Sequence, residues 1–193
     1  MVAGRVRRVR GRGAVAAVAL LLVGCVETGG GLRSVALLDG AVTAAAPTGY
    51  CLAPRTGQRS GDSAVVIMGR CSASGTAAPA VLTLSIARAG SAGVLAGGGA
   101  SLAQYFTSVE GRAALSRSGR ASDVEVVSAS DVDGAFVMQL RDLQAGETWR
   151  GVAGLRGRLV TVSVAGPAGD GLEDGQGRAL VLAALAALRR ANP

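Results

Sequence analysis

Cys25 is the residue whose surroundings most directly indicate a chemical fate. It ends the segment Leu22-Val23-Gly24-Cys25, which overlaps an unbroken apolar run over residues 14–23. Five arginines and no acidic residue precede that run: Arg5, Arg7, Arg8, Arg10 and Arg12. A basic stretch, a short apolar stretch and small residues at a cleavage point are the order of a bacterial secretory signal. The sequence therefore predicts an exported protein from which the signal peptide, residues 1–24, is removed.

The segment Leu22-Val23-Gly24-Cys25 resembles the lipobox of bacterial lipoproteins. In that family the cysteine thiol is joined to diacylglycerol, the chain is cleaved before the cysteine, and the new N-terminus is acylated with a fatty acid such as palmitate. The resemblance implies that Cys25 is the lipidation site. Several acyl chains on one residue give lasting membrane attachment, where a single chain binds only marginally. The membrane is therefore an expected partner.

The residue after the cysteine bears on localisation. Val26 stands there rather than Asp, which resembles an outer-membrane signal of the enteric sorting type. We expect a lipid-anchored protein of the cell envelope that faces the periplasm, at the outer rather than the inner membrane in a Gram-negative host.

Two other interpretations of the leader fit less well. A membrane-spanning helix needs about 20 apolar residues, and the run over residues 14–23 is half that length. A cytosolic protein with a basic tail would need neither the apolar run nor the Gly-Cys at its end. The leader thus favours lipid anchoring over both alternatives.

Export also changes the charge balance. All twenty basic residues are arginines, and five of them lie in residues 1–24. From Cys25 onward fifteen arginines face thirteen acidic residues, a formal balance of +2 instead of the +7 of the whole chain. That balance does not indicate a nucleic-acid footprint. The aromatic side chains are also too sparse for base stacking: Tyr50, Tyr105, Phe106, Phe136 and Trp149. No nucleic-acid partner is predicted.

Cys51 and Cys71 remain as an even pair once Cys25 is committed to lipid. Exported proteins form disulfides because the compartments outside the cytoplasm are oxidising. We expect a Cys51–Cys71 disulfide, whose loop of about 20 residues gives roughly 3 kcal/mol in the chain-entropy model. A redox or metal pair is the alternative, but the spacing is not Cys-x-x-Cys and no histidine could complete a zinc site. Neither a metal nor another cofactor is predicted.

Three local patterns could suggest ligand chemistry. Residues 97–101 are glycine-rich and open an expected helix, but they lack the P-loop and dinucleotide signatures; we interpret them as a loop with Ser101 as N-cap. Asp131-Val132-Asp133-Gly134 resembles a fragment of a calcium loop whose later ligands are missing; Asp-Gly between strands is typical of a hairpin. A third group of acids precedes the last helix, whose N-terminus favours negative charge: Asp170, Glu173 and Asp174.

The sequence holds no recognisable catalytic arrangement. A nucleophile or base needs a partner that orients it, and without histidine there is no Ser-His or Cys-His pair. Asp131 and Asp133 could do acid–base chemistry, but an exposed turn offers no burial to raise the pKa of a carboxylate. We expect no catalytic residues and a protein that is not an enzyme.

Hydrophobic period and turn residues predict a single α+β domain over residues 35–193, after a glycine-rich tether over residues 25–34. Residues 55–62 are expected to form a loop. Helices are expected from Ser101, around residues 113–115, and over residues 177–191. The expected architecture is an antiparallel sheet of about six to eight strands, with a mid-chain helix and a C-terminal helix packed on it. The expected strands are 35–38, 41–45, 50–52, 64–68, 81–87, 123–129, 135–140, 148–155 and 158–164.

This order of elements resembles the PsbP-like fold. The matching pieces are Pro47-Thr48-Gly49-Tyr50, the helical Leu102-Ala103-Gln104-Tyr105-Phe106, and the strand 159–164 followed by Pro167 and the last helix. The resemblance covers most of residues 41–191 and rests on order, and the cysteine pair is not part of that pattern. The chain is equally similar to bacterial envelope lipoproteins of unknown activity. PsbP-like proteins generally serve as binding or assembly accessories, so the resemblance implies a non-enzymatic role by analogy of fold.

Two functions remain open. The favoured one is a membrane-anchored binding or assembly accessory, which docks on another envelope protein through an apolar patch near Tyr105 or Trp149. The alternative is a small-ligand-binding protein or hydrolytic enzyme that uses carboxylates on the sheet face, and it predicts a deep pocket lined by Arg and Asp. The oligomeric state is left open.

Overall fold

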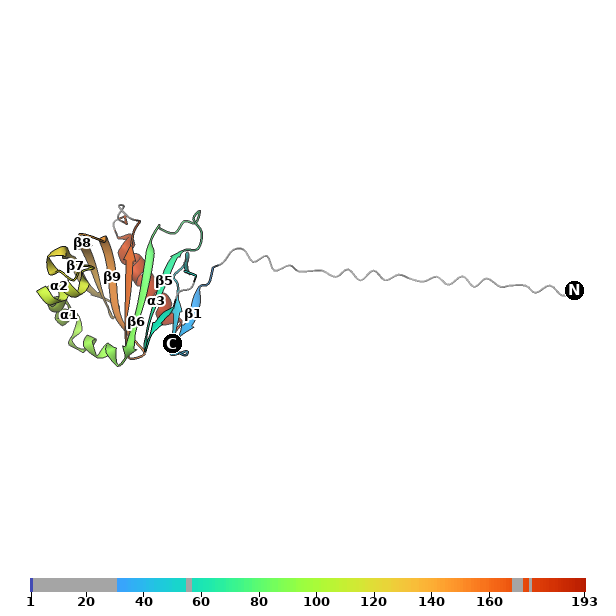
Figure 1. Ribbon diagram of the computed structural model, residues 1–193, viewed down its shortest axis with the longest axis horizontal. Coiled ribbons are helices and arrows are strands. Elements are labelled where there is room, and N and C mark those ends of the chain that lie inside the picture. Colours follow the sequence, from blue (N-terminus) through green and yellow to red (C-terminus); the bar gives the residue numbers. More distant parts are fainter. Residues whose placement is uncertain (2–30, 55–56, 168–171, 174) are drawn as a thin grey trace.

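An antiparallel sheet of eight strands forms the centre of the domain (Figure 1). The computed structural model describes Met1 and residues 31–54, 57–167, 172–173 and 175–193. The strand order is β3-β5-β6-β10-β9-β8-β7, with β4 paired to β5. The predicted α+β class is confirmed. The strands are β3 (Tyr50–Leu52), β4 (Gln58–Ser60), β5 (Ser63–Arg70), β6 (Val81–Ala89), β7 (Val124–Val132), β8 (Ala135–Asp142), β9 (Gly146–Leu155) and β10 (Arg158–Ala165).

Tight turns join successive strands and set their register. Asp133-Gly134 joins β7 to β8 with φ of 50° and 68°, and Arg156-Gly157 joins β9 to β10 with φ of 48° and 74°. Positive φ at both central residues is the geometry of the type I′ hairpin turn, whose twist matches that of the strands. A longer turn over residues 38–41, with positive φ at Leu38, Asp39 and Gly40, joins the separate hairpin of β1 (Ser34–Leu37) and β2 (Val42–Ala45). The hairpin predicted at residues 131–134 is confirmed.

Helix α3 (Gln176–Arg190) covers one face of the sheet (Figure 1). Gly151 on β9 lies so close to it that a Cβ there would overlap Val181 and contact Leu185. The hairpin β1–β2 packs on the same side, with Val42 and Ala44 fully buried. Alternate residues of the strands complete this larger core, as a period of two requires: Ala64, Val66, Met68, Leu82, Leu84, Ile86, Val160, Val162 and Val164.

Helices α1 (Gly98–Thr107) and α2 (Val109–Leu115) cover part of the opposite face, over β7 and its neighbours. A smaller core lies beneath them, in which the rings of Phe106 and Phe136 stack with centroids 6.0 Å apart. The helices do not extend over the whole face: Val65 and Ile67 on β5 remain 41% and 48% exposed. The sheet is therefore fully covered on one side and half covered on the other.

The mid-chain helices do not begin where the sequence pattern predicts. Ser101 is not an N-cap, because α1 already begins at Gly98, directly after the 3₁₀ helix η1 (Ser91–Gly97). Ser108 is the serine that caps a helix: its Oγ accepts a hydrogen bond from the Gly111 amide, 3.1 Å away, at the start of α2. The second short helix is thus confirmed, and the capping residue of the first was wrong.

The expected loop over residues 55–62 was also wrong in part. Gln58–Ser60 forms β4, which pairs with β5 around Gly61 and Asp62. All three residues of β4 are exposed. An exposed polar edge strand has no apolar alternation, so periodicity could not reveal it.

Trp149 is partly buried. Its indole packs against the larger core, and a Cβ at Gly177 of α3 would overlap the indole ring. Tyr105, the other centre suggested for docking, is 48% exposed. Tyr105 is thus the more exposed of the two expected docking centres. Within the residues that the structure describes, none of the helices has the length and apolar character needed to cross a bilayer.

Candidate functional site

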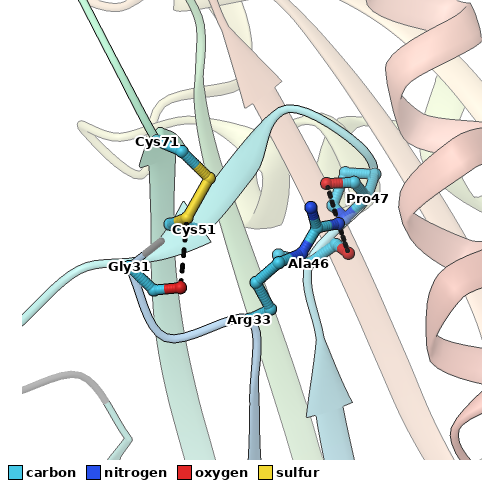
Figure 2. The surroundings of a disulfide bond; sticks show 6 residues. All are labelled: Gly31, Arg33, Ala46, Pro47, Cys51 and Cys71. Carbon is cyan, nitrogen blue, oxygen red and sulfur yellow. Dashed lines mark hydrogen bonds between the residues drawn. A yellow bond between two sulfur atoms is a disulfide. The ribbon is translucent and has the colours of Figure 1, made fainter. Parts of the chain in front are cut away.

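The Cys51–Cys71 disulfide is present and fixes the corner where the chain enters the domain (Figure 2). Cys51 lies on β3 opposite Gly69, and Cys71 directly follows β5, so the bond joins two neighbouring strands. Gly31 packs on the bond, with its carbonyl oxygen 3.4 Å from the Cys51 sulfur. Arg33 donates to the carbonyl oxygens of Ala46 and Pro47 at 3.3 and 3.1 Å. The predicted pairing is confirmed.

Cys25, the predicted lipidation site, lies outside the described residues. Residues 31–34 of the expected tether do belong to the ordered corner: Leu32 accepts a hydrogen bond from the Leu52 amide, and β1 begins at Ser34. The described fold therefore begins six residues after Cys25, at Gly31.

A cavity of about 720 Å³ lies on the half-covered face of the sheet. Its floor comes from β6, β10, β9 and β8, and its wall from the end of α2 with the residues that follow, Ser116 and Arg117. Small-ligand sites typically measure roughly 300–1,000 Å³. The cavity is thus of a size that suits a small molecule.

Strand register places the polar residues of the floor side by side. Thr83 on β6 is paired with Ser163 on β10, which is paired with Arg150 on β9. Residues paired directly across antiparallel strands lie on the same face, with Cβ atoms roughly 5 Å apart. The row beside them is mostly apolar: Val81, Ala165, Thr148 and Leu140. A polar row next to an apolar row lines the floor.

Arg150 is a half-buried cation without a bonding partner in the described part of the chain. Its guanidinium makes no hydrogen bond or ion pair there, and its Nε is buried and unsatisfied. Burial lowers the pKa of Arg150, and the charge of Asp142 opposes that shift. An arginine remains protonated at physiological pH. The cavity therefore holds a positive charge that no described side chain pairs at bonding distance.

Arg158 shows how the same fold satisfies a buried arginine. Its Nη1 donates to the carbonyl oxygens of Asp62 and Ala87 at 2.9 and 3.1 Å, and its Nη2 donates to Asp62 Oδ1 at 2.7 Å. Arg112 and Arg189, both half-buried, also donate to backbone carbonyls. Among the described arginines that are not exposed, Arg150 alone lacks such a bond.

Asp142 lines the cavity, but its carboxylate holds the wall in place. Oδ1 accepts from the amides of Gln144 and Ala145 at 2.7 and 3.0 Å, and Oδ2 accepts from the amide of Arg117 at 3.1 Å. Burial raises the pKa of Asp142, but these three amides outweigh it and hold the pKa below its usual value. An ionised carboxylate that is already bonded in this way is a poor general base at neutral pH.

The carboxylates singled out in the sequence lie away from this cavity. Asp131 is exposed on β7, and Asp133 lies in the β7–β8 turn. The Asp131 carboxylate lies against Gly99, where a Cβ would overlap it. A side-chain anion of the protein thus lies beside the first turn of α1, the end that favours negative charge.

Other predicted groups can be placed only in part. Asp170 and Asp174 lie outside the described residues, and Glu173 is exposed before α3. Among the residues with described positions, no three His, Cys, Asp or Glu side chains are grouped as a metal site would require.

Arg150 was not predicted from the sequence as a residue of this site, although its position in the strand was. The expected strand 148–155 was correct, and alternation along it puts Arg150 on the face opposite Trp149 and Gly151. A cation in the middle of a central strand is unusual, because arginine is rarely buried unless paired. That position was a usable signal, but the missing partner becomes visible only in three dimensions.

Comparison of the chain with protein-family models gives no match, and neither does comparison with curated proteins. The geometry of the cavity therefore carries the functional argument.

Proposed function

We propose that this protein is an envelope lipoprotein, anchored by lipid on Cys25, whose domain binds a small ligand in the cavity between α2 and the sheet without transforming it. The observation that carries the binding role is the cavity itself, with the unpaired Arg150 in its floor. The cavity also has the Arg and Asp lining that the small-ligand alternative predicts.

The anchor rests on the lipobox-like segment Leu22-Val23-Gly24-Cys25 and on the basic and apolar residues before it. Six residues from Cys25 to Gly31 span at most about 22 Å when fully extended. Lipid at Cys25 would therefore keep the disulfide corner next to the membrane. Because β1 and α2 lie at opposite sides of the domain (Figure 1), the wall of the cavity would lie away from the bilayer, accessible from the periplasm.

Binding without catalysis is supported by the groups that line the cavity. Its hydroxyl groups, such as those of Thr83 and Ser163, are weak nucleophiles unless a base activates them. The carboxylate of Asp142 is committed to three backbone amides. We therefore propose that the cavity binds its ligand and does not hydrolyse it.

Docking on an envelope protein is a second candidate, favoured by exposed apolar side chains on the open part of the same face. Val65, Ile67 and Val81 are 41%, 48% and 51% exposed. Val81 also lines the cavity, so a ligand there would lie beside any partner on this surface.

Blocking the cavity with a large side chain tests the binding role. Residues 25–193 with Cys25→Ser are suitable, because both cores and all described strands lie within residues 34–190. We expect this protein to bind the anionic dye 1-anilinonaphthalene-8-sulfonate or the neutral dye N-phenyl-1-naphthylamine, measured by fluorescence. Ser163→Trp, at the centre of the floor, should abolish that binding.

Thr161→Trp is the matched control, since Thr161 lies on the same strand and the same face but does not line the cavity. It should leave dye binding unchanged. The proposal fails if neither dye binds, or if the two tryptophan variants bind as well as each other.

A further inference from the structure

We propose that the ligand is a small organic monoanion, whose carboxylate binds Arg150 while its apolar part lies over the neighbouring floor of the cavity. The inference rests on the proposed function and adds the chemical class of the ligand. It follows from three features of the cavity: an unpaired cation, neighbouring hydroxyl groups, and one fixed negative charge nearby.

The unpaired charge of Arg150 favours an anionic ligand. A charge removed from water is costly unless it is paired and hydrogen-bonded, and the fold gives Arg158 but not Arg150 such partners. Buried polar groups without partners in a native protein require an explanation, for which a bound ion is one of the usual forms. An anionic ligand would supply the missing acceptor for Arg150.

The fork of donors on a guanidinium matches the two oxygens of a carboxylate, which it binds in bidentate geometry. Ser163 and Thr83 continue the same row of the floor, and their hydroxyl groups can donate to an anion. The ligand head group would therefore have donors from β9, β10 and β6.

The charge of the ligand is limited by Asp142. Its pKa lies below the usual value, so it is ionised at neutral pH, and it interacts electrostatically with Arg150. A second negative charge on the ligand would face this carboxylate, and the other arginine that lines the cavity, Arg117, is exposed to solvent, where its attraction is screened. A singly charged carboxylate fits better than a phosphate monoester, which carries nearly two charges near neutral pH.

The apolar part of the ligand has a matching surface. Val81, Ala165 and Leu140 belong to the row beside Arg150, and Leu115 of α2 contributes to the wall. An aromatic or short aliphatic group attached to the carboxylate would bury its surface there, as apolar linings of ligand sites do.

Three probes that share a naphthalene ring and differ in the charge of the head group separate the contribution of charge from that of apolar contact. They are 2-naphthoate, 2-naphthamide and 2-naphthyl phosphate. Each is titrated by calorimetry into the protein of residues 25–193 with Cys25→Ser. We expect 2-naphthoate to bind about ten- to a hundred-fold more tightly than the neutral amide, the ratio that a charged hydrogen bond gives. It should also bind more tightly than the phosphate.

Arg150→Met should remove the preference for 2-naphthoate over 2-naphthamide, while Arg88→Gln should preserve it. Arg88 is exposed and does not line the cavity, so this control removes a positive charge without touching the site. A second measurement detects a merely structural role: ligand-free Arg150→Met should melt about 2–4 °C higher than the parent, because an unpaired half-buried charge is replaced by an apolar side chain.

The proposal is overturned if the amide or the phosphate binds as tightly as 2-naphthoate, if Arg150→Met keeps the preference, or if this variant melts lower than the parent. Such results would leave the proposed function intact, provided that Ser163→Trp still blocks the two dyes. If neither the dyes nor the naphthyl probes bind the parent protein, both proposals fail together.

Discussion

Replacing Cys51 and Cys71 together by alanine is expected to lower the free energy of unfolding by about 3 kcal/mol. The bond closes a loop with a sequence separation of 20 and joins β3 to β5 at the end of the sheet. Without the disulfide the unfolded chain gains conformational entropy, because the loop is no longer closed. The folded state loses only the one covalent bond. The entry segment at Gly31 would also lose its contact with the Cys51 sulfur.

Urea unfolding of residues 25–193 with Cys25→Ser, followed by circular dichroism, measures this loss. The matched control is the parent protein in the presence of a reductant, which should lose a similar amount of stability, whereas reductant should leave the alanine variant unchanged. A stability difference below about 1 kcal/mol would show that the strand pairing of β3 with β5 holds the corner without the bond.

Leu185→Ala is expected to cost about 3 kcal/mol, within the range for leucine truncation in a well-packed core. Leu185 is 2% exposed on α3, where it faces the close approach of Gly151 on β9. Gly151 lets α3 lie close to β9. Truncation of Leu185 would therefore leave a void that the sheet cannot readily close.

Leu143→Ala provides the control for the same chemical change. Leu143 is 79% exposed in the β8–β9 turn, so its truncation should alter the free energy of unfolding by less than about 0.5 kcal/mol. Urea unfolding of both variants gives the comparison. Equal effects of the two substitutions would contradict the packing of α3 on the sheet.

Much of the fold could be predicted from local patterns, because these patterns have strong physical causes. Alternation in residues such as Val160, Val162 and Val164 reflects a strand with one buried face. Asp133-Gly134 and Arg156-Gly157 adopt the positive φ values that a tight hairpin demands. The disulfide was predicted from the expected export and from the even cysteine pair.

The remaining features depend on contacts between distant segments. Ser101 looks like an N-cap in the sequence, but α1 begins at Gly98 directly after η1, so Ser101 lies inside the helix. Ser108 caps the next helix, α2. The edge strand β4 lies wholly exposed, so it carries no apolar pattern.

The position of the cavity and the residues that line it could not be predicted for a similar reason. Its floor combines strands from residues 81 to 166, and its wall comes from α2. Sequence alternation places Arg150 on one face of a strand, but it cannot show that no acceptor arrives there from β10, β6 or α2. The predicted carboxylates, Asp131 and Asp133, lie at the β7–β8 turn instead, so the site had to be found from the geometry.

The most direct test of a lipid-anchored, exported binding protein is the intact mass of the protein extracted from membranes, alkylated with and without prior reduction. The account predicts a chain that starts at Cys25, is heavier by its acyl groups, and has two thiols, Cys51 and Cys71, that react only after reduction. A chain that keeps Met1 and carries three free thiols would contradict both the anchor and the export on which the account depends.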